Sequence, residues 1–363
     1  MRGLYIHIPF CKQICSYCDF PKMVAKEENH LKYLIALENE LKAKVCLLDK
    51  IDTVYIGGGT PNLLNNQLLE RLLKLLKPYL DSSLENTIEC NPDLITDLQA
   101  KLFKKYHINR VSMGVETINP KLLAILGRKH TKNDVLNAIN ILNLNGIRNI
   151  NLDFIFGLPF ETIEDLNNDL DFYFSLKLPH ASFYSLILEE KTIMSYKIER
   201  KEIELPDDDL VASMYDLINL RMKENDYIHY EISNYAKLGY ESSHNLLYWT
   251  QGEYVGIGMG AAGYCNDFRY TNYKTLKNYI EKVEEDRIFI SLDEKKKEYC
   301  LLGLRKLSGV SISGYFNQFH TKLFDDFDLS AHLDTGLLKI NGDMLYIPEE
   351  KMFLSNIVFL EFV

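Results

Sequence analysis

The chain has 363 residues, of which 47% are hydrophobic and 25% charged, a composition typical of globular proteins and not of disordered or collagen-like chains. Its formal net charge of −10 lacks the basic excess that binding to a phosphate backbone requires, so we expect no nucleic-acid partner. The N-terminus lacks the pattern of a signal peptide and no run of about 18 apolar residues occurs, which predicts a cytoplasmic protein with at most peripheral membrane association.

Short apolar, β-branched runs alternate with longer amphipathic stretches, a pattern typical of βα units around a parallel sheet. In chain order, strands are predicted near Leu4–Ile8, Thr53–Ile56, Asn86–Glu89, Arg110–Gly114, Asn149–Phe154 and Ser182–Leu186. Between them, three- and four-residue apolar spacing predicts helices over Lys26–Leu48, Asn65–Leu80, Thr96–Tyr106, Lys132–Leu144 and Thr162–Leu176. The sequence therefore predicts an α/β fold built as a partial (β/α)6 barrel of the TIM type.

The pattern changes after Leu205-Pro206. A helix is predicted to start at Asp207-Asp208-Asp209, a Tyr- and Gly-rich stretch runs from Tyr227 to Tyr273, and a charged helix opens at about Leu292. We therefore predict a barrel core over residues 1–205, a β-containing extension over 206–290 and a small C-terminal α+β domain over 291–363.

Three of the seven cysteines form the motif Cys11-x-x-x-Cys15-x-x-Cys18, directly after the first predicted strand. Three thiolates this close can bind one face of a cubic iron–sulfur cluster, which normally has four cysteine ligands, so one iron would stay open. A zinc site is the alternative, although zinc sites usually show paired Cys-x-x-Cys units or add histidine. The other four cysteines lie singly in apolar surroundings and are expected to be buried hydrophobes: Cys46, Cys90, Cys265 and Cys300.

Candidate ligand contacts follow the other predicted strands, at the barrel end where ligands bind. The second strand runs into Gly57-Gly58-Gly59-Thr60, where missing side chains would let the backbone approach a ligand; an ordinary turn is the alternative. The third strand ends at Glu89, a carboxylate suited to ribose hydroxyls, although a lone acid there is more often a surface or capping residue. On the fifth strand, period-two alternation points Asn151 and Asp153 into the barrel, where Asp153 needs a partner such as a nucleoside or Arg128.

The cysteine motif with Tyr17 resembles the radical SAM superfamily, in which S-adenosylmethionine (SAM) chelates the open iron. The remaining motifs resemble the family of oxygen-independent coproporphyrinogen III oxidases and, more closely, its shorter HemW branch of haem chaperones. The resemblance covers nearly the whole chain and rests on Tyr5-Ile-His7-Ile-Pro9-Phe10-Cys11, Ile56-Gly-Gly-Gly-Thr60-Pro61, Glu89-Cys-Asn91-Pro92, Leu126-Gly-Arg128-Lys-His130, Asn151-Leu-Asp153, Gly157-Leu-Pro159, Tyr230-Glu231-Ile-Ser-Asn234-Tyr-Ala236, His244-Asn245-Leu-Leu-Tyr248-Trp249 and Tyr254-Val-Gly256-Ile-Gly258-Met-Gly260.

This resemblance implies a radical SAM barrel with a C-terminal module of the oxidase family. It makes Cys11, Cys15 and Cys18 the ligands of a 4Fe-4S cluster. It implies SAM contacts from Tyr5, Tyr17, Gly58, Gly59, Thr60, Glu89, Glu116, Arg128 and Asp153. Glu116 stands where the family usually has glutamine, and Phe20 stands where the oxidases have a fourth cysteine. The oxidases also carry a longer N-terminal extension, so both differences from them argue against coproporphyrinogen decarboxylation.

The segment from His244 to Trp249 is the signature of the chaperone branch and implies haem contacts from His244, Tyr248 and Trp249. A histidine four residues before a tyrosine can share one helical face with it, the tryptophan offers a flat apolar surface, and histidine is a common haem-iron ligand. The alternative is a hydrogen-bonded structural histidine, with the aromatic residues packing the extension onto the barrel. His7, on the inward face of the first strand with Tyr5, is expected to support the cluster site.

The expected function is that of a haem chaperone that holds a 4Fe-4S cluster and SAM, binds haem as cargo and transfers it to apo-haemoproteins. An electron donor such as flavodoxin or ferredoxin is an expected partner. The alternative is a radical SAM enzyme that acts on a tetrapyrrole, either as a coproporphyrinogen III oxidase or as an anaerobic haem-degrading enzyme. A zinc-binding scaffold is a third interpretation. The sequence assigns no catalytic residue, haem acceptor or oligomeric state.

Overall fold

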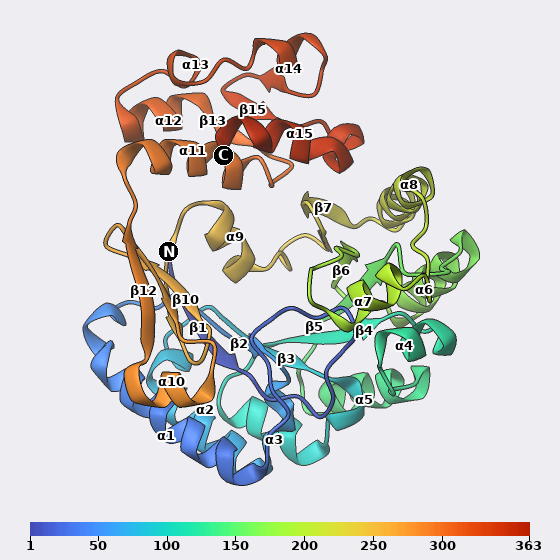
Figure 1. The fold of residues 1–363 in the computed structure, drawn as a ribbon, viewed down its shortest axis with the longest axis vertical. Coiled ribbons are helices and arrows are strands. Elements are labelled where there is room, and N and C mark those ends of the chain that lie inside the picture. The colour runs from blue at the N-terminus through green and yellow to red at the C-terminus, as the bar shows by residue number, and fades with distance from the viewer.

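The structure is a computed structural model that describes residues 1–363. Its main sheet has twelve strands in the order β12-β11-β10-β9-β1-β2-β3-β4-β5-β6-β8-β7 (Figure 1). The six predicted strands are confirmed as a parallel array at the centre of this sheet: β1 (Arg2–Ile8), β2 (Thr53–Gly58), β3 (Glu85–Cys90), β4 (Arg110–Glu116), β5 (Asn149–Phe156) and β6 (His180–Ser185).

The five predicted helices are also present, as α1 (Glu27–Ala43), α2 (Asn66–Leu80), α3 (Asp97–Lys105), α5 (Lys132–Leu144) and α6 (Ile163–Leu176). The first prediction was too long, because the chain turns at Lys44 into a short 3-10 helix (Val45–Leu47). Among the helices between the six central strands, α4 (Pro120–Leu126) was not predicted; Asn119 caps it and Gly127 ends it at φ 77°. Its seven residues are too few to show a helical period.

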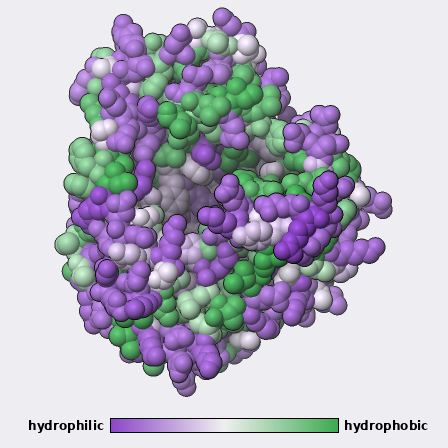
Figure 2. Space-filling view, in the orientation of Figure 1, coloured by the Kyte–Doolittle hydropathy of each residue, from purple (hydrophilic) through white to green (hydrophobic).

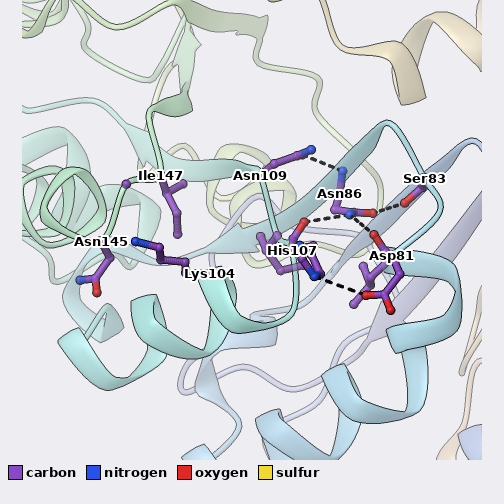
Figure 3. A pocket seen from close by; sticks show the side chains of 11 residues that line it. Asp81, Ser83, Asn86, Lys104, His107, Asn109, Asn145 and Ile147 are labelled. Carbon is purple, nitrogen blue, oxygen red and sulfur yellow. Dashed lines mark hydrogen bonds and ion pairs between the residues drawn. The ribbon is translucent and has the colours of Figure 1, made fainter.

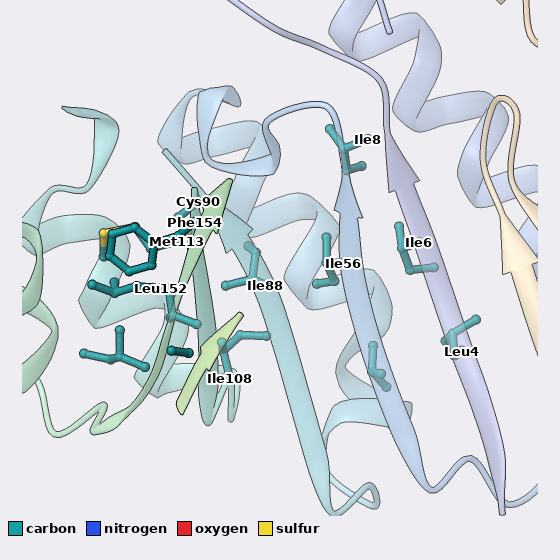
Figure 4. Close-up of a cluster of buried hydrophobic side chains, with 14 of the residues drawn as sticks. Leu4, Ile6, Ile8, Ile56, Ile88, Cys90, Ile108, Met113, Leu152 and Phe154 are labelled. Atoms are coloured by element: carbon teal, nitrogen blue, oxygen red, sulfur yellow. The ribbon is translucent and has the colours of Figure 1, made fainter. Parts of the chain in front are cut away.

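The two faces of the parallel strands differ sharply in chemistry. The outward side chains are mostly apolar and buried under the helices, as Figure 4 shows for Leu4, Ile6, Ile56 and Ile88. The inward side chains are mostly polar, and they include Asn151 and Asp153 as predicted. The barrel therefore has an apolar layer between its strands and the surrounding helices, and a polar interior that can receive a polar ligand.

The segment after residue 205 adds strands to both sides of the parallel array. The antiparallel pair β7 (Ile228–Glu231) and β8 (Asn234–Ala236) extends β6, whereas β9 (Glu253–Ile257) runs parallel to β1. Three antiparallel strands then complete the other edge: β10 (Ala262–Cys265), β11 (Phe268–Asn272) and β12 (Glu284–Phe289). The sequence predicted β structure here but not its place in the barrel sheet. The boundaries at residues 205 and 290 stay predictions.

Four further helices lie in or just before this region of the chain. α7 (Ile193–Glu199) precedes it, and α8 (Asp208–Glu224) begins at the predicted acidic start, with Asp207 as its N-cap. The others are α9 (Ser243–Trp249) and α10 (Leu276–Lys282). No helix of the chain combines the length and the apolar character that crossing a bilayer would take.

The C-terminal part opens with α11 (Leu292–Gly303), which begins where the sequence predicted. It contains an antiparallel sheet of β13 (Val310–Ser311), β15 (Met344–Tyr346) and β14 (Lys339–Asn341), with α12 (Ile312–Phe319), α13 (Leu323–Asp326), α14 (Ser330–Asp334) and α15 (Ser355–Phe359). Backbone bonds join it to the end of β7, from Ile232 to Arg305 (3.0 Å) and from Leu307 to Tyr230 (3.2 Å). Figure 2 shows a hollow between this part and the barrel, with hydrophobic side chains beside it.

Candidate functional site

The cysteine loop follows β1 at the carboxyl end of the parallel strands, where it is held by backbone hydrogen bonds. The N–H of Cys11 donates to Met23 (3.0 Å), and the N–H of Ser16 donates to Leu126 at the end of α4 (2.9 Å). The N–H of Met194, in α7, donates to Ser16 (2.8 Å). The unpredicted helices α4 and α7 therefore anchor the loop.

The three thiols Cys11, Cys15 and Cys18 are free and half-buried. Burial raises the pKa of each thiol, to about 11 for Cys15, and neighbouring thiols add to the rise at Cys11 and Cys15 because their negative charges would repel. Arg128 and Lys22 act in the opposite direction on the pKa of these thiols. Without a metal, the thiols are protonated at neutral pH, so metal binding must release protons.

The thiols lie near one another without converging on one point. No group of three or more His, Cys, Asp or Glu side chains is placed to hold a single metal ion. In a cubic cluster each thiolate binds its own iron, so the ligands need not converge. The arrangement therefore fits an iron–sulfur cluster better than a single zinc ion.

The glycine run Gly57-Gly58-Gly59 ends β2 beside the cysteine loop. A Cβ at Gly57 would lie 2.7 Å from the Glu89 carboxyl, and one at Gly58, where φ is 111°, would lie 2.5 Å from the His7 ring. A Cβ at Gly59 would meet the backbone of Pro9 at 2.8 Å. The glycines are thus needed because groups of the protein itself fill the space, and an ordinary turn would not require all three. The Thr60 hydroxyl that follows lies 3.8 Å from the Cys11 sulfur.

Glu89, at the end of β3, lies inside the barrel. Its carboxylate accepts hydrogen bonds from the Gly58 N–H (2.8 Å) and from the Tyr55 hydroxyl (2.9 Å). Burial raises the pKa of Glu89 to about 7, with Asp153 adding to the rise and Arg110 opposing it. Asp153 accepts from Ser112 and Asn151, both at 2.8 Å, so its partners are polar side chains of the barrel and not Arg128.

Arg128 instead forms a largely buried ion pair with Glu116. It also donates to Asn91 Oδ1 (2.8 Å) and to the Tyr17 hydroxyl (3.4 Å), while its Nε has no hydrogen-bond partner. Glu116 ends β4 at φ 61°, a conformation uncommon for a residue with a side chain. The Arg128 guanidinium thus links the cysteine loop, the end of β3 and the end of β4, and its Nε–H remains free to donate a hydrogen bond.

His7 lies at this end of the barrel, where its role in supporting the cluster site stays a prediction. Its Nδ1 lies 3.0 Å from the Tyr5 hydroxyl, and its Nε2 lies 2.7 Å from the carbonyl oxygen of Pro21, just after the cysteine loop. Burial lowers the pKa of His7 to about 4, so the ring is neutral at physiological pH. The structure therefore brings together every predicted contact of the cluster and of SAM at the carboxyl end or the adjoining interior of the barrel.

His244 lies at the opposite, amino end of the strands, in α9. Its Nδ1 lies 2.8 Å from Thr53 Oγ1, and its Nε2 lies 2.9 Å from the Tyr248 hydroxyl of the same helix. The histidine is 1% exposed, and burial lowers its pKa to about 3. The predicted shared helical face of His244 and Tyr248 is confirmed. A haem-ligating role stays a prediction, and the occupied ring nitrogens favour the structural alternative.

Trp249, at the end of α9, packs between the barrel and the C-terminal part. The Arg305 guanidinium lies 5.1 Å from the centroid of its ring, and its Nε1 is buried with no hydrogen-bond partner. Sequence reasoning did not identify Tyr55, Asn91 or Ser112 as parts of the polar interior. The period-two pattern that placed Tyr5 inward would have found Tyr55, its direct neighbour across the sheet.

A separate cavity of about 300 Å³ lies at the amino end of β3 and β4 (Figure 3). Asn86 and His107 are among its lining residues, and the Asn86 side chain is fully engaged with Leu80, Ser83 and the His107 carbonyl. None of the predicted site residues lines it. This cavity is therefore not part of the candidate site.

Comparisons with known proteins agree with this geometry. Residues 5–173 match the family model of the Radical SAM superfamily. The chain is 38% identical to the haem chaperone HemW of Lactococcus lactis, over 100% of this chain and 97% of that protein, and 36% identical to HemW of Bacillus subtilis, over 100% and 99%. The solved structure of coproporphyrinogen III oxidase (HemN) from Escherichia coli superimposes with a TM-score of 0.87 at 21% identity, over 99% of this chain and 89% of that one, and so shares the fold.

Proposed function

Because the chain belongs to the HemW family of haem chaperones, we propose that it binds haem and transfers it to apo-haemoproteins. The observation that carries this proposal is similarity over the full length of curated chaperones, including the segment from His244 to Trp249. The chain is a radical SAM protein with a 4Fe-4S cluster and SAM as cofactors.

We call the carboxyl end of the parallel strands, with the cysteine loop, the mouth of the barrel. Its residues fit both cofactors. Cys11, Cys15 and Cys18 would hold the cluster, since they are free thiols placed near one another and near the cation of Arg128. When bound, such a cluster supplies one-electron chemistry at its open iron. Arg128 keeps an unpartnered Nε, and Glu89 is a buried carboxylate with acceptor capacity beyond its two bonds, so these two residues would bind and orient SAM.

The cargo would use a surface outside the polar interior. A porphyrin is flat and largely apolar, and the hollow between the barrel and the C-terminal part has hydrophobic side chains beside it (Figure 2). We place the protein in the cytoplasm, with contact to membranes at most peripheral, and expect a small reducing protein such as flavodoxin or ferredoxin as electron donor. The acidic net charge of −10 supports the absence of a nucleic-acid partner.

Haem titration of the anaerobically reconstituted protein tests this function. Trp249 is the only tryptophan, so its emission can be followed together with the Soret band of haem. We expect saturable quenching at one equivalent, followed by transfer of the haem to an added apo-haemoprotein. Absence of saturable haem binding would contradict the chaperone function. Multiple turnovers of coproporphyrinogen in the presence of reductant and SAM would show that the protein is a radical enzyme. The same titration in His244→Ala measures whether the motif contributes to haem affinity.

A further inference from the structure

The helix α9 closes the amino end of the barrel and is held there by hydrogen bonds to Glu85 and Thr53. The Glu85 carboxylate, at the start of β3, accepts from the N–H of Ser243 (2.8 Å), the N–H of His244 (3.1 Å) and the Ser242 hydroxyl (3.2 Å). Glu85 is 7% exposed, so its carboxylate binds the start of this helix from within the protein. We call α9 with Ser242 the barrel floor.

One chain of contacts leads from the floor to Glu89. The imidazole of His244 stacks on the ring of Tyr55, with 5.1 Å between ring centroids and 30° between planes. The Tyr55 hydroxyl donates to Glu89 Oε1 (2.9 Å), and Glu89 Oε2 accepts from the Gly58 N–H (2.8 Å). The flat face of the His244 ring is the surface against which Tyr55 rests, and the ring nitrogens bond Thr53 and Tyr248.

A second chain of contacts leads from the floor to Asp153. The N–H of Ser242 donates to the Tyr230 hydroxyl (3.2 Å), which lies 2.8 Å from His180 Nε2. The Nδ1 of His180 lies 2.6 Å from Asn151 Oδ1, and Asn151 Nδ2 donates to Asp153 Oδ1 (2.8 Å). Both chains therefore end on carboxylates that line the interior next to the cofactor residues.

We propose that His244 is a positioning residue for SAM, which holds Tyr55 and through it Glu89 in the orientation that binds the cofactor. This inference rests on the proposed function, because it takes Glu89 as a SAM contact. It gives the signature helix a role at the cofactor site, through the barrel interior, that does not require His244 to touch haem. Preorganised polar groups bind more tightly because less freedom is lost on binding, which is the contribution expected of the floor.

The test is a double-mutant cycle on SAM affinity, measured by calorimetry with the cluster-reconstituted protein. His244→Ala removes the support under Tyr55, and Tyr55→Phe removes the bond to Glu89. Each is expected to weaken SAM binding about five- to tenfold, the range of one lost hydrogen bond. Because both act through one contact, the double variant should be no weaker than either single variant by more than about twofold.

His244→Phe separates positioning from stability. It keeps an aromatic ring against Tyr55 but leaves Thr53 and Tyr248 without their partner, so we expect a lower melting temperature with SAM affinity within about twofold of the parent. If His244→Ala does not fold, His244→Phe and Tyr55→Phe still provide the comparison. SAM affinity lost in His244→Phe as fully as in Tyr55→Phe would overturn the proposal.

His229→Ala is the matched control. His229 is also a buried histidine stacked on a tyrosine, Tyr235, with 4.4 Å between ring centroids, but it lies in β7 at the outer edge of the sheet. The His229→Ala variant should be less stable than the parent and should bind SAM with the same affinity. Equal SAM affinity in His244→Ala and the parent would overturn the positioning role, whereas failure of the parent itself to bind SAM would remove the proposed function as well. Haem titration of the same variants distinguishes the two failures.

Discussion

The two ends of the barrel differ in how far their key polar groups are bonded within the protein. At the floor, the polar groups of Glu85 and His244 are all engaged with partners in the protein. At the mouth, three thiols are free and the Arg128 Nε has no partner, although that nitrogen is fully buried. Buried polar groups are normally hydrogen-bonded, but the Arg110 Nε and Trp249 Nε1 near the floor also lack a partner. It is therefore the free thiols beside the unpartnered Arg128 Nε that mark the mouth as the ligand-binding end.

This difference explains why residue type alone does not identify a ligand site. A histidine, a tyrosine and a tryptophan in one short helix suggest a haem contact, but here the histidine is closed on both sides. An arginine–glutamate pair suggests a structural ion pair, but here the arginine retains an open donor. Substitutions at each end of the barrel test whether the mouth and the floor separate in this way.

Substitution of the cysteines should give the largest effect. Cys11→Ala, Cys15→Ala or Cys18→Ala should each abolish the broad iron–sulfur absorption and lower iron well below four per chain after anaerobic reconstitution, because each thiolate binds its own iron. Cys46→Ala should retain the full spectrum, because Cys46 lies outside the motif. The expected burial of Cys46 was wrong, since the structure exposes it, whereas Cys90, Cys265 and Cys300 are buried as expected. A motif variant with normal iron content would show that the cluster lies elsewhere.

Removal of the mouth cation should lower both stability and cofactor binding. Arg128→Ala leaves Glu116 buried without its partner, which should lower the free energy of unfolding by about 3 kcal/mol in denaturant titrations. Adding Glu116→Gln removes the unpaired charge and should restore most of that stability while SAM binding stays weak. Recovery of SAM affinity in the double variant would show that Arg128 has a structural role only and does not bind SAM.

At the floor, the effect should be on stability and not on iron. Glu85→Gln weakens charge-assisted bonds to three donors of the floor and should cost about 1–2 kcal/mol of unfolding free energy. Iron content after reconstitution should match the parent. Loss of iron in this variant, at parental levels of folded protein, would break the distinction between the two ends.

The pH dependence of SAM affinity should give the smallest effect. Glu89 must be ionised to accept from two ribose hydroxyls, and its pKa is raised to about 7, so SAM should bind more tightly as pH rises through that value. Between pH 8 and pH 7 the ionised fraction falls by about twofold, which is the expected loss of affinity. Asp153, Arg110 and Tyr55 also lie near the Glu89 carboxyl. Comparison with Glu89→Gln therefore identifies the group that titrates, because this variant should remove the change in SAM affinity near pH 7.

Local sequence patterns were sufficient for the parallel core and for the mouth. Period-two alternation located the six central strands, and the motif Cys11-x-x-x-Cys15-x-x-Cys18 depends only on nearby spacing. Strand ends also gave Glu89 and Asp153, because parallel strands bring their carboxyl ends to one edge. These predictions needed no knowledge of which distant segments meet.

The remainder depended on contacts between distant parts of the chain. The expected partner of Asp153 was a nucleoside or Arg128, but Glu116, at φ 61°, pairs with the Arg128 guanidinium instead. The position of His244 at the barrel floor depends on Thr53 and Glu85, which lie far away in the sequence. Nothing in a single sequence shows such pairings, because each partner is an ordinary polar residue at one end of a strand or in a loop.

The pairing of β1 with β9 has a consequence for biosynthesis. β1 is complete at Ile8, yet the strand that covers its second edge begins at Glu253. At typical translation rates of about 5–20 residues per second, the ribosome needs roughly 10–50 s to supply it. During that time the first strand has an open edge, which can pair with the wrong strand, and the cysteine motif emerges beside it. A nascent chain of this design therefore needs protection of its earliest residues until synthesis is more than two-thirds complete.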